Sequence, residues 1–437
     1  MTRVPFHALK TLFTLSLSIL AALFTLGLTS QAFAQSTDKG FITAKTWIDP
    51  ANGHAAAGNG TTDDTQNMQD MVNYAIANHA SIQLEPGTYK ISKTLMIQNP
   101  PQGFHFGFRM SGIGGPNDTN TTWNNSGVSI SLVTSDPTQL AIVEVGAGSF
   151  YDMTFENIGL CTSTNGQPSA VPVKYGLLFA GQNFSHVKID MVTVTTVNTA
   201  FAIDVVPGIN QGGNGEAVNI SNCRCDSCNC FYLNNSPAGQ ALAHSISRCE
   251  FGIKNGGSAI RMMRDGLGID ITSFSGTFQA GPLRNTLIEC DGFPAYVNYT
   301  GGRVEICDTV IWYAGGSTIC RGCVTVRGMD FGGFGWGGAT YGLIDDTLGG
   351  GGAQQYTNTL EECRFTGDSA TALSIAHSSL WDASKNYFDR CTFMDFTNNL
   401  TDASNQADLK RIGAVVRDCR SATDLQGNLM FTNMSFP

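Results

Sequence analysis

Charged residues are scarce in this chain of 437 residues. Only 14% are Asp, Glu, Lys or Arg, and 25 basic residues face 35 acidic ones. A surface with so few cations argues against nucleic acids and anionic membranes as partners. After residue 80 the sequence also lacks apolar residues at helical spacing, which excludes a mainly helical fold.

Known catalytic and cofactor motifs are missing too. The sequence contains no nucleophile elbow, HExxH, P-loop or dinucleotide fingerprint. Histidine is rare, with seven in the chain, and its scattered positions give a Ser-His-Asp triad no local support. We therefore predict no metal ligands from motifs, and carboxylates remain the best candidates for chemistry.

The N-terminus has the features of an export signal. Arg3 and Lys10 precede an apolar run, and Ala32 and Ala34 suit cleavage after Ala34. The alternative is an uncleaved membrane anchor. A signal peptide at 1–34 predicts a secreted or periplasmic protein, free of the membrane after cleavage, with a net charge of −12. The absence of a linker predicts one domain over residues 35–437.

One amphipathic helix is expected over residues 61–80, where Thr62, Asp63 and Asp64 offer a helix cap. Over residues 81–97 the apolar residues instead recur at every second position, which predicts strands, with a turn at Pro86 and Gly87. The helix should bury one apolar stripe, formed by Met68, Met71, Val72, Ala75 and Ile76.

The stretch "GTTDDTQNMQDMVNYAIANHASIQLEPGTYKIS" (60–92) resembles the opening of right-handed parallel β-helix proteins of the pectate lyase superfamily. Within that superfamily it is most similar to the rhamnogalacturonase/epimerase-like pectate lyase type. A second stretch, "MSGIGG" (110–115), matches the same proteins loosely. The resemblance implies an all-β, single-stranded right-handed parallel β-helix with an N-terminal capping helix, with coils over 81–437. A homotrimer is one expectation for such a protein. The polygalacturonase motifs of the superfamily do not occur in order, so no catalytic residue is carried over.

Short apolar runs broken by Gly, Asn or Asp recur from Phe150 onward, as expected for a solenoid. Three Cys-x-Phe units stand out, because residues i and i+2 of a strand face the same side. We interpret the cysteines at 249, 290, 323, 363, 391 and 419 as an interior column of mostly free thiols, with disulfides as the alternative. The units are Cys249/Phe251, Cys363/Phe365 and Cys391/Phe393.

A second cysteine group, "CRCDSCNC" (223–230), places four sulfurs in eight residues. Zinc sites usually need two ligand pairs separated by a folded stretch, so the group is too crowded for one ion without a tight loop. Core packing is the preferred interpretation, ahead of a local disulfide and a metal site.

Aspartates recur at intervals near one coil: Asp270, Asp291, Asp308 and Asp330. If they align on one face, neighbours would lie about 5 Å apart and alternate residues about 10 Å. Those values bracket the carboxylate separations of glycosidases. Turn formation is the competing explanation, because Asp is common in β-turns. We predict catalytic roles for Asp270, Asp291, Asp265 and Asp330.

Arginines and aromatic residues supply candidate substrate contacts. "RMMRDGLGID" (261–270) places two arginines beside acids, although surface ion pairs are the common outcome of such a pattern. "GMDFGGFGWGGATYGLIDDTLGGGG" (328–352) has too many glycines for a strand and is expected to be a long mobile loop carrying aromatics. The predicted substrate-binding residues are Arg261, Arg264, Trp312, Tyr313, Trp336 and Tyr341.

The leading functional hypothesis is a secreted enzyme that cleaves glycosidic bonds in a polysaccharide or oligosaccharide by carboxylate acid/base catalysis. Hydrolysis is favoured slightly over β-elimination by a lyase, which usually uses a cation and for which Ca²⁺ is the candidate. A non-catalytic glycan-binding adhesin or tailspike-like protein is the second class of function, and a sugar epimerase is the third.

Overall fold

The structure is a computed structural model. It describes residues 40–98, 104–116, 127–164, 167–181, 183–204, 215–236, 243–264, 268–292, 296–314, 321–335, 341–346, 355–368, 370–378, 385–398, 400–421 and 430–435. The predicted signal peptide lies outside these ranges. Among the described residues, no helix is both long enough and apolar enough to cross a bilayer.

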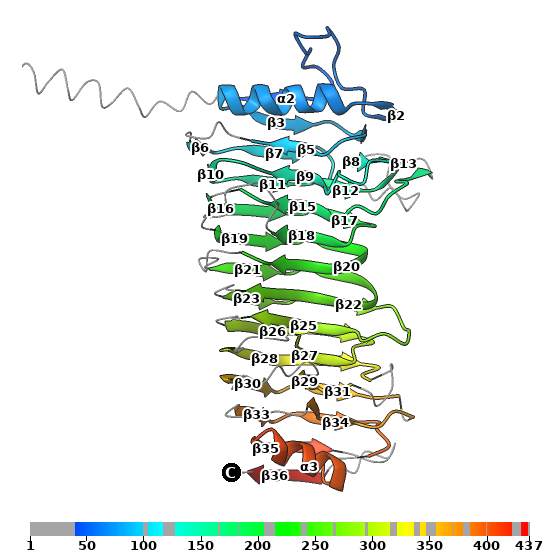
Figure 1. The fold of residues 1–437 in the computed structure, drawn as a ribbon, viewed down its shortest axis with the longest axis vertical. Coiled ribbons are helices and arrows are strands. Elements are labelled where there is room, and N and C mark those ends of the chain that lie inside the picture. Colours follow the sequence, from blue (N-terminus) through cyan, green and yellow to red (C-terminus); the bar gives the residue numbers. More distant parts are fainter. Residues whose placement is uncertain are drawn as a thin grey trace, which may run out of the picture. The chain divides into compact units, whose positions relative to one another are not determined.

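The chain from Phe41 onward forms a right-handed parallel β-helix, so the predicted fold class is confirmed. Its coils lie one above another between helix α2 (Thr65–Asn78) and helix α3 (Ala403–Arg411) (Figure 1). Strand pairing divides the coils into three parallel ladders, called ladder 1, ladder 2 and ladder 3 below. Strand β36 (Met430–Ser435) pairs antiparallel with the last strand.

Ladder 1 consists of β1 (Phe41–Thr43), β3 (Ser81–Leu84), β6 (Phe104–Phe106), β7 (Arg109–Gly112), β10 (Ser149–Tyr151), β11 (Thr154–Glu156), β16 (Asn183–Asp190), β19 (Gly215–Ser221), β21 (His244–Ser247), β23 (Ile269–Thr272), β26 (Tyr296–Glu305), β28 (Arg321–Gly332), β30 (Gln355–Glu361), β33 (Lys385–Asp389) and β35 (Ala414–Ser421).

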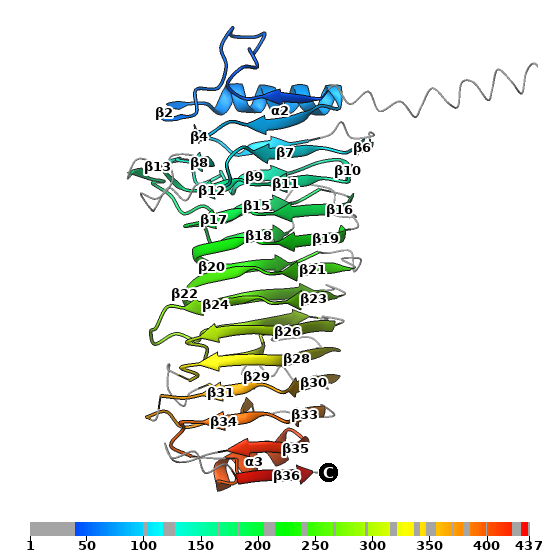
Figure 2. The ribbon, with the colours of Figure 1, turned by 180° about the vertical axis from the view of Figure 1, so that it is seen from behind.

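Ladder 2 consists of β2 (Asn59–Asp63), β4 (Gly87–Ile91), β8 (Val128–Leu132), β12 (Gly159–Cys161), β17 (Thr193–Thr195), β20 (Arg224–Asn234), β22 (Glu250–Arg264), β24 (Ser275–Phe278), the second halves of β26 and β28, β31 (Arg364–Thr366), β34 (Thr392–Met394) and the end of β35. Figure 2 shows several of these strands from the other side.

Ladder 3 consists of β5 (Leu95–Ile97), β9 (Ala141–Val145), β15 (Tyr175–Phe179), β18 (Thr199–Ile203), the second halves of β20 and β22, β25 (Thr286–Gly292), β27 (Thr309–Tyr313), β29 (Ile344–Asp346) and β32 (Ala376–Ser378). A short hairpin, β13 (Ser163–Thr164) with β14 (Gln167–Pro168), stands apart from the ladders.

The cysteine column lies at the corner between ladders 1 and 2. Many coils turn there on one residue with positive φ, such as Asn222 (53°) and Arg248 (51°). The backbone N–H of each corner residue donates to a carbonyl of the next coil, as from Asn222 to Ser247 (3.0 Å). The following side chain points into the core, and at five coils it is a buried cysteine: Cys223, Cys249, Cys363, Cys391 and Cys419.

The predicted interior column is confirmed for Cys249, Cys363, Cys391 and Cys419, but not for the whole series. Cys290 is buried in ladder 3, and Cys323 is exposed on ladder 1. The phenylalanines of the Cys-x-Phe units follow two residues later in ladder 2. The rings of Phe331, Phe365 and Phe393 stack with centroids 4.8 and 5.1 Å apart. The four sulfurs at 223–230 are also buried and unpaired, so core packing is the correct interpretation.

We expect the corner thiols to be reduced and slow to react in the folded protein. Burial raises the pKa of Cys223, and the hydrogen bonds that Cys391 donates to Cys363 and Cys419, together with burial, raise that of Cys391. Hydrogen bonds from Cys223 and Cys391 lower the pKa of Cys249 and Cys419, so it is burial that keeps reagents from all five thiols. Alkylation followed by peptide mass spectrometry should label the exposed Cys323 rapidly and the corner cysteines only after denaturation without reductant. A disulfide-linked peptide joining Cys223 to Cys249 would contradict this prediction.

The glycine-rich stretch at 328–352 differs from the expected loop. Strand β28 continues to Gly332, and β29 occupies Ile344–Asp346. Phe331 faces the core and is fully buried, because Phe365 of the next coil stacks on its ring and Phe334 of its own coil packs edge-on against it. The glycines therefore did not prevent strand formation, and the aromatic ring at 331 packs the solenoid rather than a ligand.

Helix α2 covers the open end of the core, as predicted, although it is shorter than expected. The five predicted stripe residues are all buried against the first coil. Asp64 occupies the N-cap position without a side-chain cap bond. Its carboxylate instead accepts the N–H groups of Ala57 and Gly58 (2.6 and 2.9 Å), which fixes the preceding loop.

Two buried histidines predict acid sensitivity. Burial lowers the pKa of His244 from 6.5 to about 4, and burial together with His79 does the same for His105. Below pH 6.5 the unfolded chain binds protons that the folded chain excludes until about pH 4, so the free energy of unfolding falls with pH. Denaturant titrations should show a loss of about 2 kcal/mol per histidine between pH 7 and pH 5. His244→Gln should remove the part of this pH-dependent loss that His244 causes. An unchanged pH dependence of the free energy of unfolding in that variant would contradict the prediction.

Candidate functional site

The predicted row of aspartates is wrong. Asp270 is exposed on ladder 1, Asp291 lies on ladder 3, and Asp330 faces outward on ladder 2, in register with Arg303 and Arg364. Asp308 is buried and accepts the N–H of Asn285 (2.9 Å). The physical reason is coil length, because Asp270 contacts Asn298, 28 residues later, whereas the aspartate intervals are 17–22 residues.

Several other predicted site residues are not placed on a common surface. Asp265 and Trp336 lie outside the described residues, and Arg264 ends β22 with its side chain outside them. Tyr313 points into the core and donates to Asn358 (2.6 Å), so its predicted place on an aromatic platform is wrong.

Ladder 3 does bring predicted residues together. Its strands alternate in this region, with Ile260, Ile288, Ile311 and Ile344 in the core and the next residue on the outer face. The outward column therefore reads Arg261, Glu289, Trp312 and Asp345 on successive coils. With Arg284 and Tyr341 from adjacent segments, these residues form what we call the ladder 3 cluster.

The ladder 3 cluster is unusually buried for a charged outer face. Arg261 Nε lies 2.7 Å from Glu289 Oε2, and their side chains are 29% and 9% exposed. Arg284 Nη2 lies 2.7 Å from Asp345 Oδ2, with exposures of 12% and 0%. Desolvating two ion pairs costs free energy that a surface pair would avoid. Buried, paired charges in one place are typical of functional sites, although structural networks also contain them.

Trp312 and Tyr341 enclose the guanidinium of Arg284. Its central carbon lies 4.5 Å from the centroid of each ring, in cation–π geometry. Burial lowers the pKa of Arg284, although Asp345 opposes the shift. The two predicted aromatic residues are thus adjacent, but one face of each is covered by an arginine rather than left open for a sugar ring.

Glu289 and Asp291 form the best carboxylate pair of the face. They are two residues apart on β25, so both point outward, and their α-carbons are separated by about 7 Å. The hydrogen bonds that Glu289 makes to described residues, from Ser258 and Arg261, both end on Oε2. Oε1 is therefore left for a water or a substrate, and Asp291 is only half-buried.

Glu289 and Arg284 were missed by sequence reasoning. Glu289 carried a usable signal, since a lone acid in the apolar run "TLIEC" must face outward if its neighbours are in the core. Arg284 carried none, because it precedes β25 and reaches Asp345 through contacts between residues distant in the chain.

Metal binding finds no support in the part of the chain that the structure describes. No three acidic, histidine or cysteine side chains there are grouped to hold a cation. In the ladder 3 cluster, arginines already neutralise Glu289 and Asp345. These residues do not fit a Ca²⁺ site, which would need several free carboxylate or carbonyl oxygens.

Comparisons with known proteins support the fold of the chain and do not identify its function. No protein-family model matches the chain, and no curated protein matches it. The structure of DFA-IIIase from Arthrobacter chlorophenolicus A6, in complex with DFA-III, is similar with a TM-score of 0.51 at 13% identity, covering 87% of this chain and 93% of that one.

Two further structures have lower scores. The A-module of mannuronan C-5 epimerase AlgE6 from Azotobacter vinelandii has a TM-score of 0.47 at 14% identity, over 84% of this chain and 97% of that one. The catalytic unit of the GH87 α-1,3-glucanase from Streptomyces thermodiastaticus has a TM-score of 0.46 at 13% identity, over 87% and 70%. The parallel β-helix implied by residues 60–92 is confirmed, and membership of the pectate lyase superfamily stays a prediction.

Proposed function

We propose that the chain is an exported enzyme that hydrolyses glycosidic bonds of a polysaccharide on the outer face of ladder 3. The proposal depends on one observation, the side-by-side Glu289 and Asp291 on β25, with Glu289 in register between Arg261 and Trp312. A fold of this kind does not decide chemistry, so the proposal rests on the site.

The pair suits an inverting mechanism. The two side chains leave the strand in the same direction from α-carbons about 7 Å apart, so we infer a similar separation of their carboxyl groups. The ~6.5–9.5 Å between carboxyl groups that leaves room for a water includes this value. Glu289 Oε1 takes a proton from the water that attacks the anomeric carbon, while the carboxyl group of Asp291 donates a proton to the leaving oxygen. Arg261 holds Glu289 in place through its bond to Oε2 (2.7 Å).

Elimination by a lyase is the second candidate for the same face. It would use one of these carboxylates differently and leave an unsaturated product, but it needs a basic proton acceptor and usually a cation. Arginines already pair with Glu289 and Asp345, which leaves these carboxylates poorly suited to hold a cation and favours hydrolysis. A protein that only binds glycans would not need two carboxyl groups at a separation suited to acid/base catalysis.

A polysaccharide panel tests the proposal directly. Neutral and uronic-acid polysaccharides incubated with the mature protein should yield new reducing ends, and product analysis by NMR should show an inverted anomeric configuration in the first products. Ultraviolet absorbance should stay flat, and EDTA should have no effect. Binding without new reducing ends, or absorbance that requires Ca²⁺, would overturn the proposal.

A further inference from the structure

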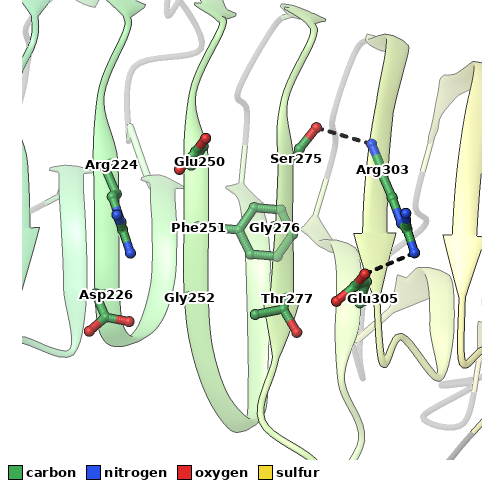
Figure 3. A pocket seen from close by; sticks show the side chains of 10 residues that line it. All are labelled: Arg224, Asp226, Glu250, Phe251, Gly252, Ser275, Gly276, Thr277, Arg303 and Glu305. Carbon is green, nitrogen blue, oxygen red and sulfur yellow. Dashed lines mark hydrogen bonds and ion pairs between the residues drawn. The ribbon is translucent and has the colours of Figure 1, made fainter.

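A hollow lies on a different face of the solenoid from the ladder 3 cluster. It crosses β20, β22, β24 and β26 on the outer side of ladder 2 and has a volume of about 340 Å³ (Figure 3). That volume falls within the ~300–1,000 Å³ of small-molecule sites. We call it the ladder 2 groove.

Two outward columns line the groove, although the register between β20 and β22 shifts after Cys225. The first contains Arg224, Glu250, Ser275 and Arg303, and the second contains Asp226, Gly252, Thr277 and Glu305. An arginine and a carboxylate therefore lie side by side on β20 (Arg224 and Asp226) and again on β26, three strands further along the ladder (Arg303 and Glu305). Three rung spacings make the distance between these ends about 14 Å.

The middle of the groove is lined by the small residues Gly252, Ser275 and Thr277, together with the carboxylate of Glu250. A Cβ added at Gly252 would lie 2.5 Å from Asp226 Oδ1, which places that carboxylate over the position where a side chain is missing. Arg303 is held at the other end, with Nη2 3.0 Å from Glu305 and its backbone N–H donating to Ser275 Oγ (3.0 Å).

The lining favours a neutral ligand rich in hydroxyl groups. Guanidinium and hydroxyl groups donate hydrogen bonds while carboxylates accept them, and a vicinal diol both donates and accepts. Two arginines face three carboxylates, so the groove carries a slight negative charge that disfavours a polyanion. Its length suits a short run of sugar rings laid along the solenoid axis.

We propose that the ladder 2 groove binds a short stretch of neutral glycan, apart from the cleavage site on ladder 3. Such a site would hold a polysaccharide chain on the protein without taking part in its chemistry. The proposal does not depend on hydrolysis, because the groove shares no residue with the ladder 3 cluster.

Calorimetric titration with cellotriose, maltotriose, laminaritriose and trigalacturonate tests the groove. At least one neutral trisaccharide should bind, and trigalacturonate should bind more weakly. Thr277→Trp fills the groove and should weaken binding at least tenfold. Thr366→Trp is the matched control, since Thr366 occupies the same outward column beyond the groove and its substitution should change nothing.

A second variant protects the test against misfolding. The Arg303 side chain is 63% exposed, so Arg303→Gln should fold normally and should also weaken neutral trisaccharide binding. Glu289→Gln should retain full binding, which separates this proposal from the cleavage site. Failure of all three neutral trisaccharides to bind, or undiminished binding in both groove variants, would show that the groove contains surface ion pairs only.

Discussion

Replacing Glu289 with Gln, or Asp291 with Asn, should lower kcat by about 10²–10⁴-fold, the usual contribution of a general acid or base. Both substitutions keep the shape of the side chain and remove its proton chemistry. The amide introduced in place of the Glu289 carboxylate can still contact Ser258 and Arg261, so KM should change far less than kcat. Initial rates on the best polysaccharide of the panel, measured with thermal unfolding, provide the check.

Glu362→Gln is the matched control for both variants. Glu362 is also a surface acid of the solenoid, but it lies at the corner between ladders 1 and 2, outside both proposed sites, and is 53% exposed. Its variant should retain wild-type kcat. Wild-type turnover in both ladder 3 variants would remove this pair from the mechanism, whereas a loss in only one would identify the carboxyl group that remains essential.

Sequence reasoning predicted the fold well because its signals are local. The helix stripe, the change of period after residue 80 and the Cys-x-Phe units each depend on residues a few positions apart. Burial of Cys249 and Cys363 follows from strand alternation plus a corner residue with positive φ. The error at Phe331 came from weighing glycine content above the apolar alternation around it.

The site could not be predicted with the same success, because it depends on which residues of successive coils lie next to one another in the same ladder. Arg261 and Trp312 were selected for their chemistry, and they do lie on one column. Asp270 was selected by its interval, and a coil of 28 residues places it on another ladder. An error of a few residues in coil length moves a side chain to a different face, so spacing alone could not identify Glu289.

Replacing Arg284 with Met should lower the free energy of unfolding by about 3–5 kcal/mol, the cost of breaking a buried ion pair by removing one partner. Asp345 has no exposed surface and would lose the arginine that neutralises it. The rings of Trp312 and Tyr341 would also lose the cation between them, which adds to the cost. Denaturant midpoints of the mature protein at pH 7 measure the effect.

A double-mutant cycle separates the ion pair from general packing damage. If the pair causes the loss, Arg284→Met combined with Asp345→Asn should cost clearly less than the sum of the single variants. Arg303→Met, which breaks an exposed pair with Glu305, should cost at most about 1 kcal/mol. Additive costs at Arg284 and Asp345 would show that the two charges do not support each other, and that the aromatic enclosure alone holds the arginine in place.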